Sequence, residues 1–112
     1  DYFHKIFISN NENFIYPVVP YPHPVQRAMR ITKSGKMKFV FKEHELTRTQ
    51  DLEKLYHDTG QLYWGKSNAW LEEKKMHSAG VGIPVKPWKF VDIDDENDWL
   101  FAEILFKNLI KL

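Results

Sequence analysis

The sequence contains no cysteine. Disulfide frameworks, thiolate metal sites and cysteine nucleophiles are therefore excluded together, and the composition fits a reducing compartment. No apolar run approaches the roughly 20 residues that a membrane-spanning helix needs. The sequence also has no excess of one sign of charge, because 16 lysines and arginines balance 15 aspartates and glutamates to a formal net charge of +1. This balance gives no reason to expect a nucleic acid or a membrane surface as the partner.

Several common catalytic motifs are missing as well. The five histidines form neither an HExxH pair nor another spacing typical of metal ligands. The sequence has no Gly-rich phosphate loop and no Ser-centred nucleophile elbow. Asp1–Lys5 lacks both an initiator Met and the basic-then-apolar pattern of a signal peptide. We therefore expect a processed or truncated chain.

The 112 residues amount to one domain or part of one. An aromatic content of 15% supplies bulky core material. Strand-like and helix-like segments alternate along the chain, which favours an α/β layer architecture. The sequence contains no internal repeat and no low-complexity segment.

Short β-branched and aromatic runs predict the strands. A polar turn with a glycine, Lys33–Lys36, separates two of these runs and predicts a β-hairpin. Four prolines within residues 17–24 predict a stiff, extended connector. The expected strands span residues 2–8, 14–19, 25–32, 37–42, 61–64, 81–85 and 90–93.

Three helices are expected. Thr47 and Gln50 have the spacing of a capping box for a helix that runs to about His57 and ends by Gly60. A second, short helix is expected over residues 67–75. Asp94 or Asp95 can cap the last helix, in which Glu103 and Lys107 form an i,i+4 pair. Its apolar face contains Trp99, Ala102, Phe106, Leu109 and Ile110.

Asp92 and Asp94 stand two positions apart, just before the last helix. In an extended segment, residues i and i+2 point to the same side, so both carboxylates would meet at one spot. Mg²⁺ typically takes one or two carboxylates together with substrate phosphates and water. Spacing alone slightly favours the alternative, in which these acids only cap and charge the helix N-terminus.

The segment Tyr56–Gly65 interleaves polar groups with aromatic rings between two glycines. A small-ligand pocket has this character, and the amide of Gln61 can both donate and accept hydrogen bonds. The alternative, equally favoured by the residues alone, is a helix terminus followed by a buried aromatic strand. His57 and Asp58 are sequence neighbours, which does not make them a geometric dyad.

A group of polar and basic side chains can meet phosphates or a sugar carboxylate. Composition alone favours the alternative, in which these side chains are solvent-exposed surface residues of the hairpin. The group consists of Gln26, Arg27, Arg30, Lys33 and Arg48.

Three stretches together resemble the CMP-sialic acid synthetase family and, within it, the pseudaminic acid cytidylyltransferases. The run Tyr56-His57-Asp58-Thr59-Gly60-Gln61-Leu62-Tyr63-Trp64-Gly65, preceded by Arg48–Leu52, is the most specific of them. Tyr21–Ala28 lies upstream, and Asp92–Trp99 lies downstream with the Asp-Ile-Asp motif that the wider superfamily shares. The resemblance covers roughly Pro20–Leu112.

The resemblance implies a three-layer, Rossmann-like nucleotide-diphosphosugar-transferase fold, of which this chain is the C-terminal half. It implies a cytoplasmic homodimer that uses CTP and Mg²⁺ to activate an acidic nine-carbon sugar and releases pyrophosphate. Asp92 and Asp94 match the magnesium-binding catalytic pair, and residues 24–48 match a β extension that reaches the partner subunit. The substrate-binding residues that it implies are Gln26, Arg27, His57, Asp58, Thr59, Gly60, Gln61 and Tyr63.

The chain also departs from the family pattern. Family members begin with a strand and a basic, Gly-containing loop that holds the CTP triphosphate, and nothing like that loop occurs here. Sialic acid synthetases tend to have Arg-Pro-Asn-Gly where this chain has His57-Asp58-Thr59-Gly60, which favours pseudaminate over N-acetylneuraminate. Legionaminate or an octulosonate as the sugar, and a non-catalytic binding or dimerisation module, are the alternatives. Balanced charge makes a nucleic-acid-binding domain a distant third.

Overall fold

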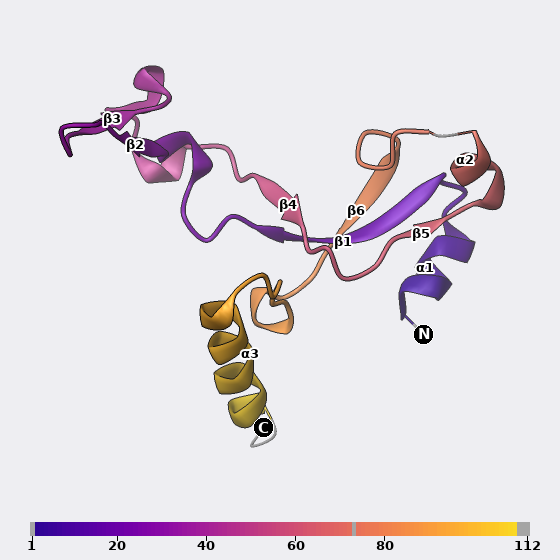
Figure 1. Cartoon of the computed structure of the whole chain (residues 1–112). Helices are drawn as coiled ribbons and strands as arrows, with labels where there is room; N and C mark the ends of the chain where they lie inside the picture. Colours follow the sequence, from indigo (N-terminus) through magenta and orange to yellow (C-terminus); the bar gives the residue numbers. More distant parts are fainter. Residues whose placement is uncertain (1, 73, 110–112) are drawn as a thin grey trace. The chain divides into compact units, whose positions relative to one another are not determined.

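The computed structural model describes residues 2–72 and 74–109 (Figure 1). The chain divides into two compact units. The first unit combines the segment up to Val19 with the segment from Asp58 onward, and the second is Pro20–His57. Helices and strands alternate in the first unit, so the α/β class is confirmed, whereas the three-layer arrangement remains a prediction.

The strand β1 (Phe14–Pro20) contains most of the buried apolar residues. Phe14 and Ile15 are fully buried, and Val19 is almost so. This strand was expected, because a short apolar run bounded by polar residues is typical of a strand buried on both faces. Proline within the run does not interrupt it, and Pro17 is itself among the fully buried side chains.

Strands of both orientations pair with β1. β5 (Trp64–Gly65) is antiparallel to it, and β6 (Gly80–Pro84) is parallel to it. Phe14 pairs with Gly65 in β5 and with Gly80 in β6, so β1 lies between these two strands. β4 (Tyr56–Asp58) completes the four-stranded sheet, whose order is β4-β1-β5 with β6 also paired to β1.

The prediction of a strand over residues 2–8 was wrong. The segment forms the helix α1 (Tyr2–Ser9), because its aromatic residues recur at helical spacing rather than at alternate positions. The rings of His4 and Phe7 lie 4.9 and 6.0 Å from the ring of Trp64. These ring contacts pack one face of the helix against β5, although none of its residues is fully buried.

The helix expected over residues 47–57 was also wrong. Only a single 3-10 turn, η3 (Thr49–Asp51), forms there, and Leu52 already has an extended conformation. The Leu55 carbonyl accepts a hydrogen bond from the Tyr21 amide at 3.1 Å, so extended pairing replaces the helical ladder. Gly60 does not end a helix but lies in a turn after β4, with φ +70°.

The hairpin predicted in the second unit is confirmed. β2 (Met29–Ile31) and β3 (Met37–Phe39) pair antiparallel, and each is shorter than expected. Gly35 has φ +84°, which suits the left-handed position of a tight turn. Two further 3-10 turns, η1 (Val25–Arg27) and η2 (Lys42–His44), flank the hairpin.

The chain after β5 departs from the sequence prediction in two places. The expected helix over residues 67–75 is shorter, and forms α2 (Ser67–Leu71). The strand predicted over residues 90–93 is absent from the described sheet, and these residues follow the 3-10 turn η4 (Pro87–Lys89) as irregular chain. A strand needs a neighbour that satisfies its backbone groups, and none of the described strands pairs with these residues.

The last helix, α3 (Glu96–Leu109), is confirmed. Asp95 Oδ1 accepts hydrogen bonds from the amides of Asn97 and Asp98, and Asp98 Oδ2 accepts from the amides of Asp94 and Asp95. This reciprocal cap satisfies the first orphan amides of the helix. The predicted pair also forms, with Lys107 Nζ 3.7 Å from a Glu103 carboxylate oxygen.

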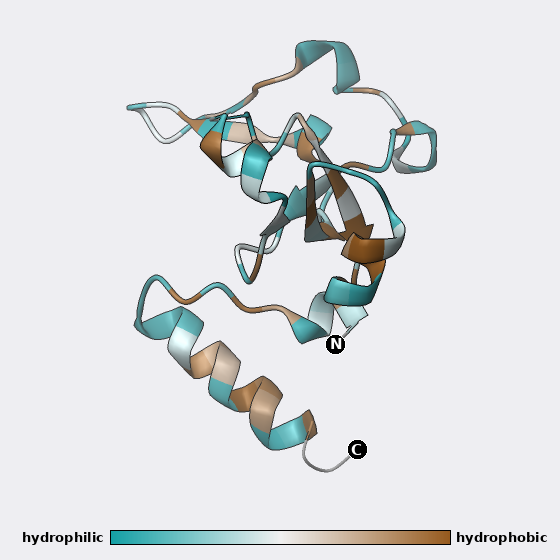
Figure 2. Ribbon diagram, turned by 90° about the vertical axis from the view of Figure 1, so that its right-hand side faces the viewer, coloured by the Kyte–Doolittle hydropathy of each residue, from teal (hydrophilic) through white to brown (hydrophobic). Residues whose placement is uncertain are grey.

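No residue of α3 for which burial is described is buried, although apolar residues (brown ribbon in Figure 2) recur along the helix. Trp99, Phe101 and Phe106 are each more than half exposed. Ile110, which was predicted on the same face, lies outside the described residues. Across residues 2–72 and 74–109, no helix is long and apolar enough to cross a membrane.

Gly65 provides a test of the core. A Cβ there would meet the Trp70 ring at 2.4 Å and the Phe14 ring at 2.6 Å. These two rings pack edge to face with centroids 4.8 Å apart, and Phe14 is fully buried. We expect Gly65→Ala to lower the free energy of unfolding by about 1–3 kcal/mol, measured by denaturant titration of the protein that contains this chain. Asn68→Ala, at an exposed position of α2, is the control. Equal stability of the two variants would contradict the packing described here.

Candidate active site

The site is centred on the turn after β4, which a backbone hydrogen bond holds against β1. The Thr59 amide donates to the Pro17 carbonyl of β1 at 3.1 Å, and Thr59 is only 2% exposed. Gly60 then reverses the chain with a positive φ that other residues rarely adopt. The Gln61 amide approaches Thr59 Oγ1 at 3.4 Å. Burial of Thr59 thus holds Asp58, which precedes it, and Gln61, two residues after it, in defined places.

The carboxylate of Asp58 joins two other polar side chains. The Tyr63 hydroxyl donates a hydrogen bond to Asp58 Oδ2, and His77 Nε2 lies 3.4 Å from the same oxygen. The hydrogen bond from Tyr63 lowers the pKa of Asp58, His77 adds to this effect, and partial burial opposes it. The same contact raises the pKa of Tyr63 to about 12, because ionisation of its hydroxyl would place a negative charge beside the carboxylate.

His77 is held in place by β1. The Tyr16 hydroxyl donates to the His77 carbonyl at 2.8 Å, and the two rings lie 5.5 Å apart. Burial, and then the charge of Asp58, raises the pKa of Tyr16. Sequence reasoning missed both residues, because 61 positions separate them and neither belongs to a recognisable motif. Only a polar tyrosine within an otherwise apolar buried strand hinted at a partner.

A distant part of the sequence, which contains Lys89 and Asp92, approaches the same turn. Gln61 Nε2 donates to the Lys89 carbonyl at 3.1 Å, which ties the turn to η4. A Cβ built on Gly60 would lie 3.9 Å from Asp92 Oδ2. The charge of Asp92 also contributes to the raised pKa of Tyr63. The structure therefore brings together Asp58, Thr59, Gly60, Gln61, Tyr63 and Asp92, six of the predicted site residues.

Asp92 and Asp94 are both exposed, and the hydrogen bonds that cap α3 come from Asp95 and Asp98 instead. Helix capping therefore does not account for the Asp-Ile-Asp spacing. Within the described part of the chain, no group of three or more His, Cys, Asp or Glu side chains is placed to hold a metal ion. Two exposed carboxylates fit a Mg²⁺ ion whose other ligands are phosphate and water, which is the usual mode for this metal.

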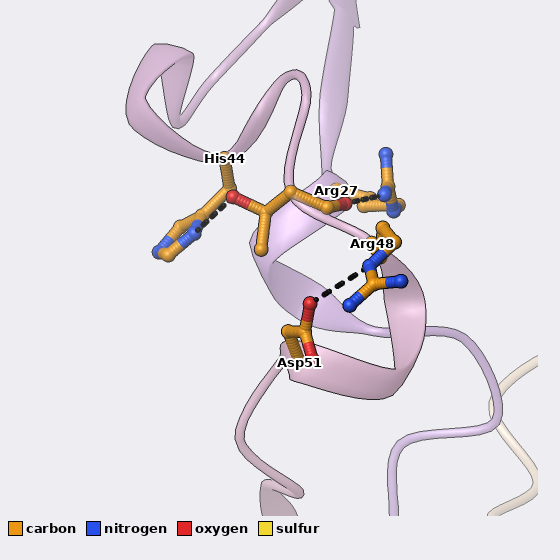
Figure 3. Close-up of polar contacts among 5 residues, drawn as sticks. Arg27, His44, Arg48 and Asp51 are labelled. Carbon is orange, nitrogen blue, oxygen red and sulfur yellow. Dashed lines mark hydrogen bonds and ion pairs between the residues drawn. The ribbon is translucent and has the colours of Figure 1, made fainter.

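The remaining predicted residues, Gln26, Arg27 and His57, lie in the second unit. Gln26 Nε2 donates to the Glu53 carbonyl at 2.9 Å, which leaves its buried Oε1 without a partner in the described structure. The Arg27 guanidinium donates to the Thr47 carbonyl, as Figure 3 shows. The His57 ring lies 4.9 Å from that of Tyr21. Gln26 also lines a cavity of about 190 Å³ within this unit.

The other basic residues of the second unit make local contacts. Arg48 pairs with Asp51 at 3.1 Å in the turn η3, also drawn in Figure 3, and the arginine side chain is 73% exposed. Arg30 and Lys33 are exposed on the hairpin. Exposed pairs of this kind contribute little to stability. Binding of phosphate or a sugar carboxylate by these residues stays a prediction.

The fold and the site together define an α/β protein with a carboxylate-rich, aromatic-lined polar site. No family model matches the chain. The chain is 37% identical over 102 residues to proteins named pseudaminic acid cytidylyltransferase from two strains of Campylobacter jejuni subsp. jejuni, 81-176 and NCTC 11168. Each match covers 90% of this chain. The predicted resemblance is thereby confirmed, and the chain is homologous to part of the pseudaminic acid cytidylyltransferases.

The chain spans 44% of the length of these two relatives. It is also 34% identical over 86 residues to a Helicobacter pylori protein named pseudaminic acid cytidylyltransferase and UDP-2,4-diacetamido-2,4,6-trideoxy-beta-L-altropyranose hydrolase. That match covers 76% of this chain and 16% of the relative. Partial coverage of this kind agrees with the expectation that the chain corresponds to one portion of such a protein.

The contact between Asp58 and Tyr63 predicts a titration shift. In Asp58→Asn the charge is lost, so ionised Tyr63 is penalised less and its pKa falls from about 12 toward the ordinary value near 10. Tyrosinate absorbance or ring-carbon NMR, followed against pH, measures the change. Tyr2→Phe, at an exposed position on α1, identifies the background from other tyrosines. A Tyr63 pKa that stays near 12 in Asp58→Asn would contradict the described contact.

Proposed function

We propose that this chain is the C-terminal portion of a cytidylyltransferase that converts CTP and pseudaminic acid into CMP-pseudaminic acid and pyrophosphate. Homology to relatives of that name over 90% of the chain carries the proposal. The cluster of Asp58, Gln61, Tyr63 and Asp92 supports it, because residues from two of the three stretches that carry the resemblance lie side by side. In a three-layer fold, as the resemblance implies, the missing part of the protein supplies the CTP-binding loop.

Asp92 and Asp94 are the residues that would hold Mg²⁺. When bound, Mg²⁺ offsets the negative charge that grows at the α-phosphate during transfer. The protein's own contribution to this chemistry is placement and charge, since little covalent work falls to side chains in phosphoryl transfer. The cap formed by Asp95 and Asp98 fixes the start of α3, and therefore the backbone that carries Asp94.

The turn from Asp58 to Tyr63 is the proposed sugar-binding segment. It combines carboxylate, hydroxyl and amide groups with the aromatic face of Tyr63, a combination suited to a polar sugar. Its backbone is anchored on β1, so the recognition groups need little ordering when the sugar binds. Legionaminate, N-acetylneuraminate and octulosonate would meet the same groups with different substituents, and remain the alternative substrates.

The hairpin of the second unit is the proposed dimerisation arm. The registered pairs Met29–Phe39 and Ile31–Met37 share one face, and Arg30 and Lys38 form a pair on the other. Met29, Ile31 and Met37 are between 50 and 72% exposed. A two-stranded hairpin is marginally stable alone, and an exposed apolar face of this kind is typical of an interaction surface. A second copy of the chain is the partner that the family resemblance supplies.

The activity is tested by pyrophosphate release from the full-length protein that contains this chain. We expect release with CTP, Mg²⁺ and pseudaminate, and none with legionaminate or N-acetylneuraminate. We expect Asp94→Asn to lower turnover by about 100-fold or more with the stability unchanged, since the lost charge stabilisation amounts to several kcal/mol.

Glu96→Gln is the matched control for Asp94→Asn. It removes an exposed carboxylate from the first turn of α3 and leaves the cap intact, so we expect turnover to stay close to that of the wild type. Normal turnover of Asp94→Asn at saturating Mg²⁺ would refute the metal role. No release with any of the three sugars would instead leave the binding or dimerisation module as the better interpretation.

The dimerisation proposal predicts that Ile31→Lys weakens self-association at least about tenfold, because it places a charge in the apolar face of the hairpin. Analytical ultracentrifugation over a concentration series measures the dissociation constant. Lys38→Ala, on the opposite face, is the control and should leave that constant unchanged. Equal constants for wild type and Ile31→Lys would exclude the hairpin face as the dimer contact.

A further inference from the structure

Asp58, at the start of the proposed sugar-binding segment, is also in contact with His77. A carboxylate that contacts one nitrogen of an imidazole is the arrangement that orients a histidine for proton transfer. The contact is 3.4 Å long and joins Asp58 Oδ2 to His77 Nε2. The same oxygen accepts the Tyr63 hydrogen bond, so the carboxylate is itself fixed in orientation.

With Nε2 facing Asp58, the other ring nitrogen, Nδ1, carries the lone pair that can accept a proton. When Asp58 accepts a proton shared with Nε2, it selects the tautomer in which Nδ1 is basic and stabilises the imidazolium that forms after protonation. The His77 side chain is 63% exposed, so a substrate hydroxyl can reach the ring. Asp58, at 30%, is the more enclosed partner, as an orienting carboxylate should be.

The surroundings of His77 are defined on three elements. Asp58 approaches it from β4, Tyr16 from β1 and Tyr63 from the turn before β5. The rings of Tyr16 and Tyr63 lie 5.5 and 6.1 Å from the imidazole. Both tyrosines are neutral at neutral pH, so Asp58 is the charged group among these three. Its carboxylate is in contact with the imidazole.

β1 places the pair. Tyr16 holds the His77 carbonyl, and the next residue of the strand, Pro17, holds the Thr59 amide beside Asp58. Neighbouring residues on one buried strand therefore fix both partners, and Tyr63 links them to the turn that Asp92 approaches. The pair lies at the same turn as the proposed sugar-binding segment.

We propose that His77 is the general base for the proposed cytidylyl transfer, with Asp58 as its positioning residue; the inference rests on that proposed function. Nδ1 takes the proton of the sugar's anomeric hydroxyl. The oxygen electron pair then forms the bond to the α-phosphorus of CTP, and the bond from that phosphorus to the bridging oxygen breaks. Pyrophosphate leaves with the electron pair of the broken bond, and His77 returns its proton to solvent.

The experiment uses the full-length protein with CTP, Mg²⁺ and pseudaminate, and compares His77→Ala, His77→Gln and wild type. We expect kcat to fall by about 100-fold or more in both variants, with KM for each substrate nearly unchanged. The pH profile of kcat/KM should lose one ionisation on its acidic side in His77→Gln. Added imidazole should restore turnover to His77→Ala, whose vacated position is open to solvent, but not to His77→Gln.

His23→Gln is the matched control, since His23 is an exposed histidine of the second unit and lies outside the proposed machinery. A His77→Gln variant with wild-type kcat and an unchanged pH profile would overturn the inference while the proposed function stands. So would a loss of kcat in His77→Ala that imidazole does not restore, because a purely structural role predicts that result. A wild-type protein that releases no pyrophosphate would overturn the proposed function, and the inference with it.

Discussion

Burial of β1 is the constraint on which the first unit depends. Its apolar side chains leave water on both faces, and its backbone must then be satisfied by neighbouring strands. Glycine in the paired strands permits the close approach: a Cβ on Gly80 would lie 2.6 Å from the Tyr16 ring, and one on Gly82 would lie 2.9 Å from Val18. The strand thereby becomes a rigid support for the polar groups attached to it.

The candidate site is built on that support. Residues 16 and 17 of the strand hold a turn that follows β4 and a loop that precedes β6, and these two segments carry Asp58 and His77. The polar cluster is therefore coupled to the core, although its own side chains are partly exposed. Functional residues on loops are commonly positioned in this way, because the rigid scaffold fixes where their side chains lie.

Sequence reasoning succeeded where local signals agreed. The apolar run of β1, the glycine turn of the hairpin and the acidic start of α3 each specify one structure. It failed where a local signal was overridden or misread. Aromatic residues at helical spacing were taken for a strand over residues 2–8, and the capping box at Thr47 gave way to extended chain leading into β4. Residues 90–93 have strand-like composition but no described partner strand.

The sequence by itself indicated the resemblance to the pseudaminic acid cytidylyltransferases, the Asp-Ile-Asp pair and the aromatic segment before β5, because these features lie within short stretches of the chain. The tertiary structure decided that Asp95 and Asp98 cap α3 in place of Asp94, and that Asp58 contacts His77 from a distant part of the chain. The physical reason is the same in both cases. Hydrogen bonds depend on distances of a few ångströms, and only the pairing of β1 with β4, β5 and β6 brings distant residues within that range.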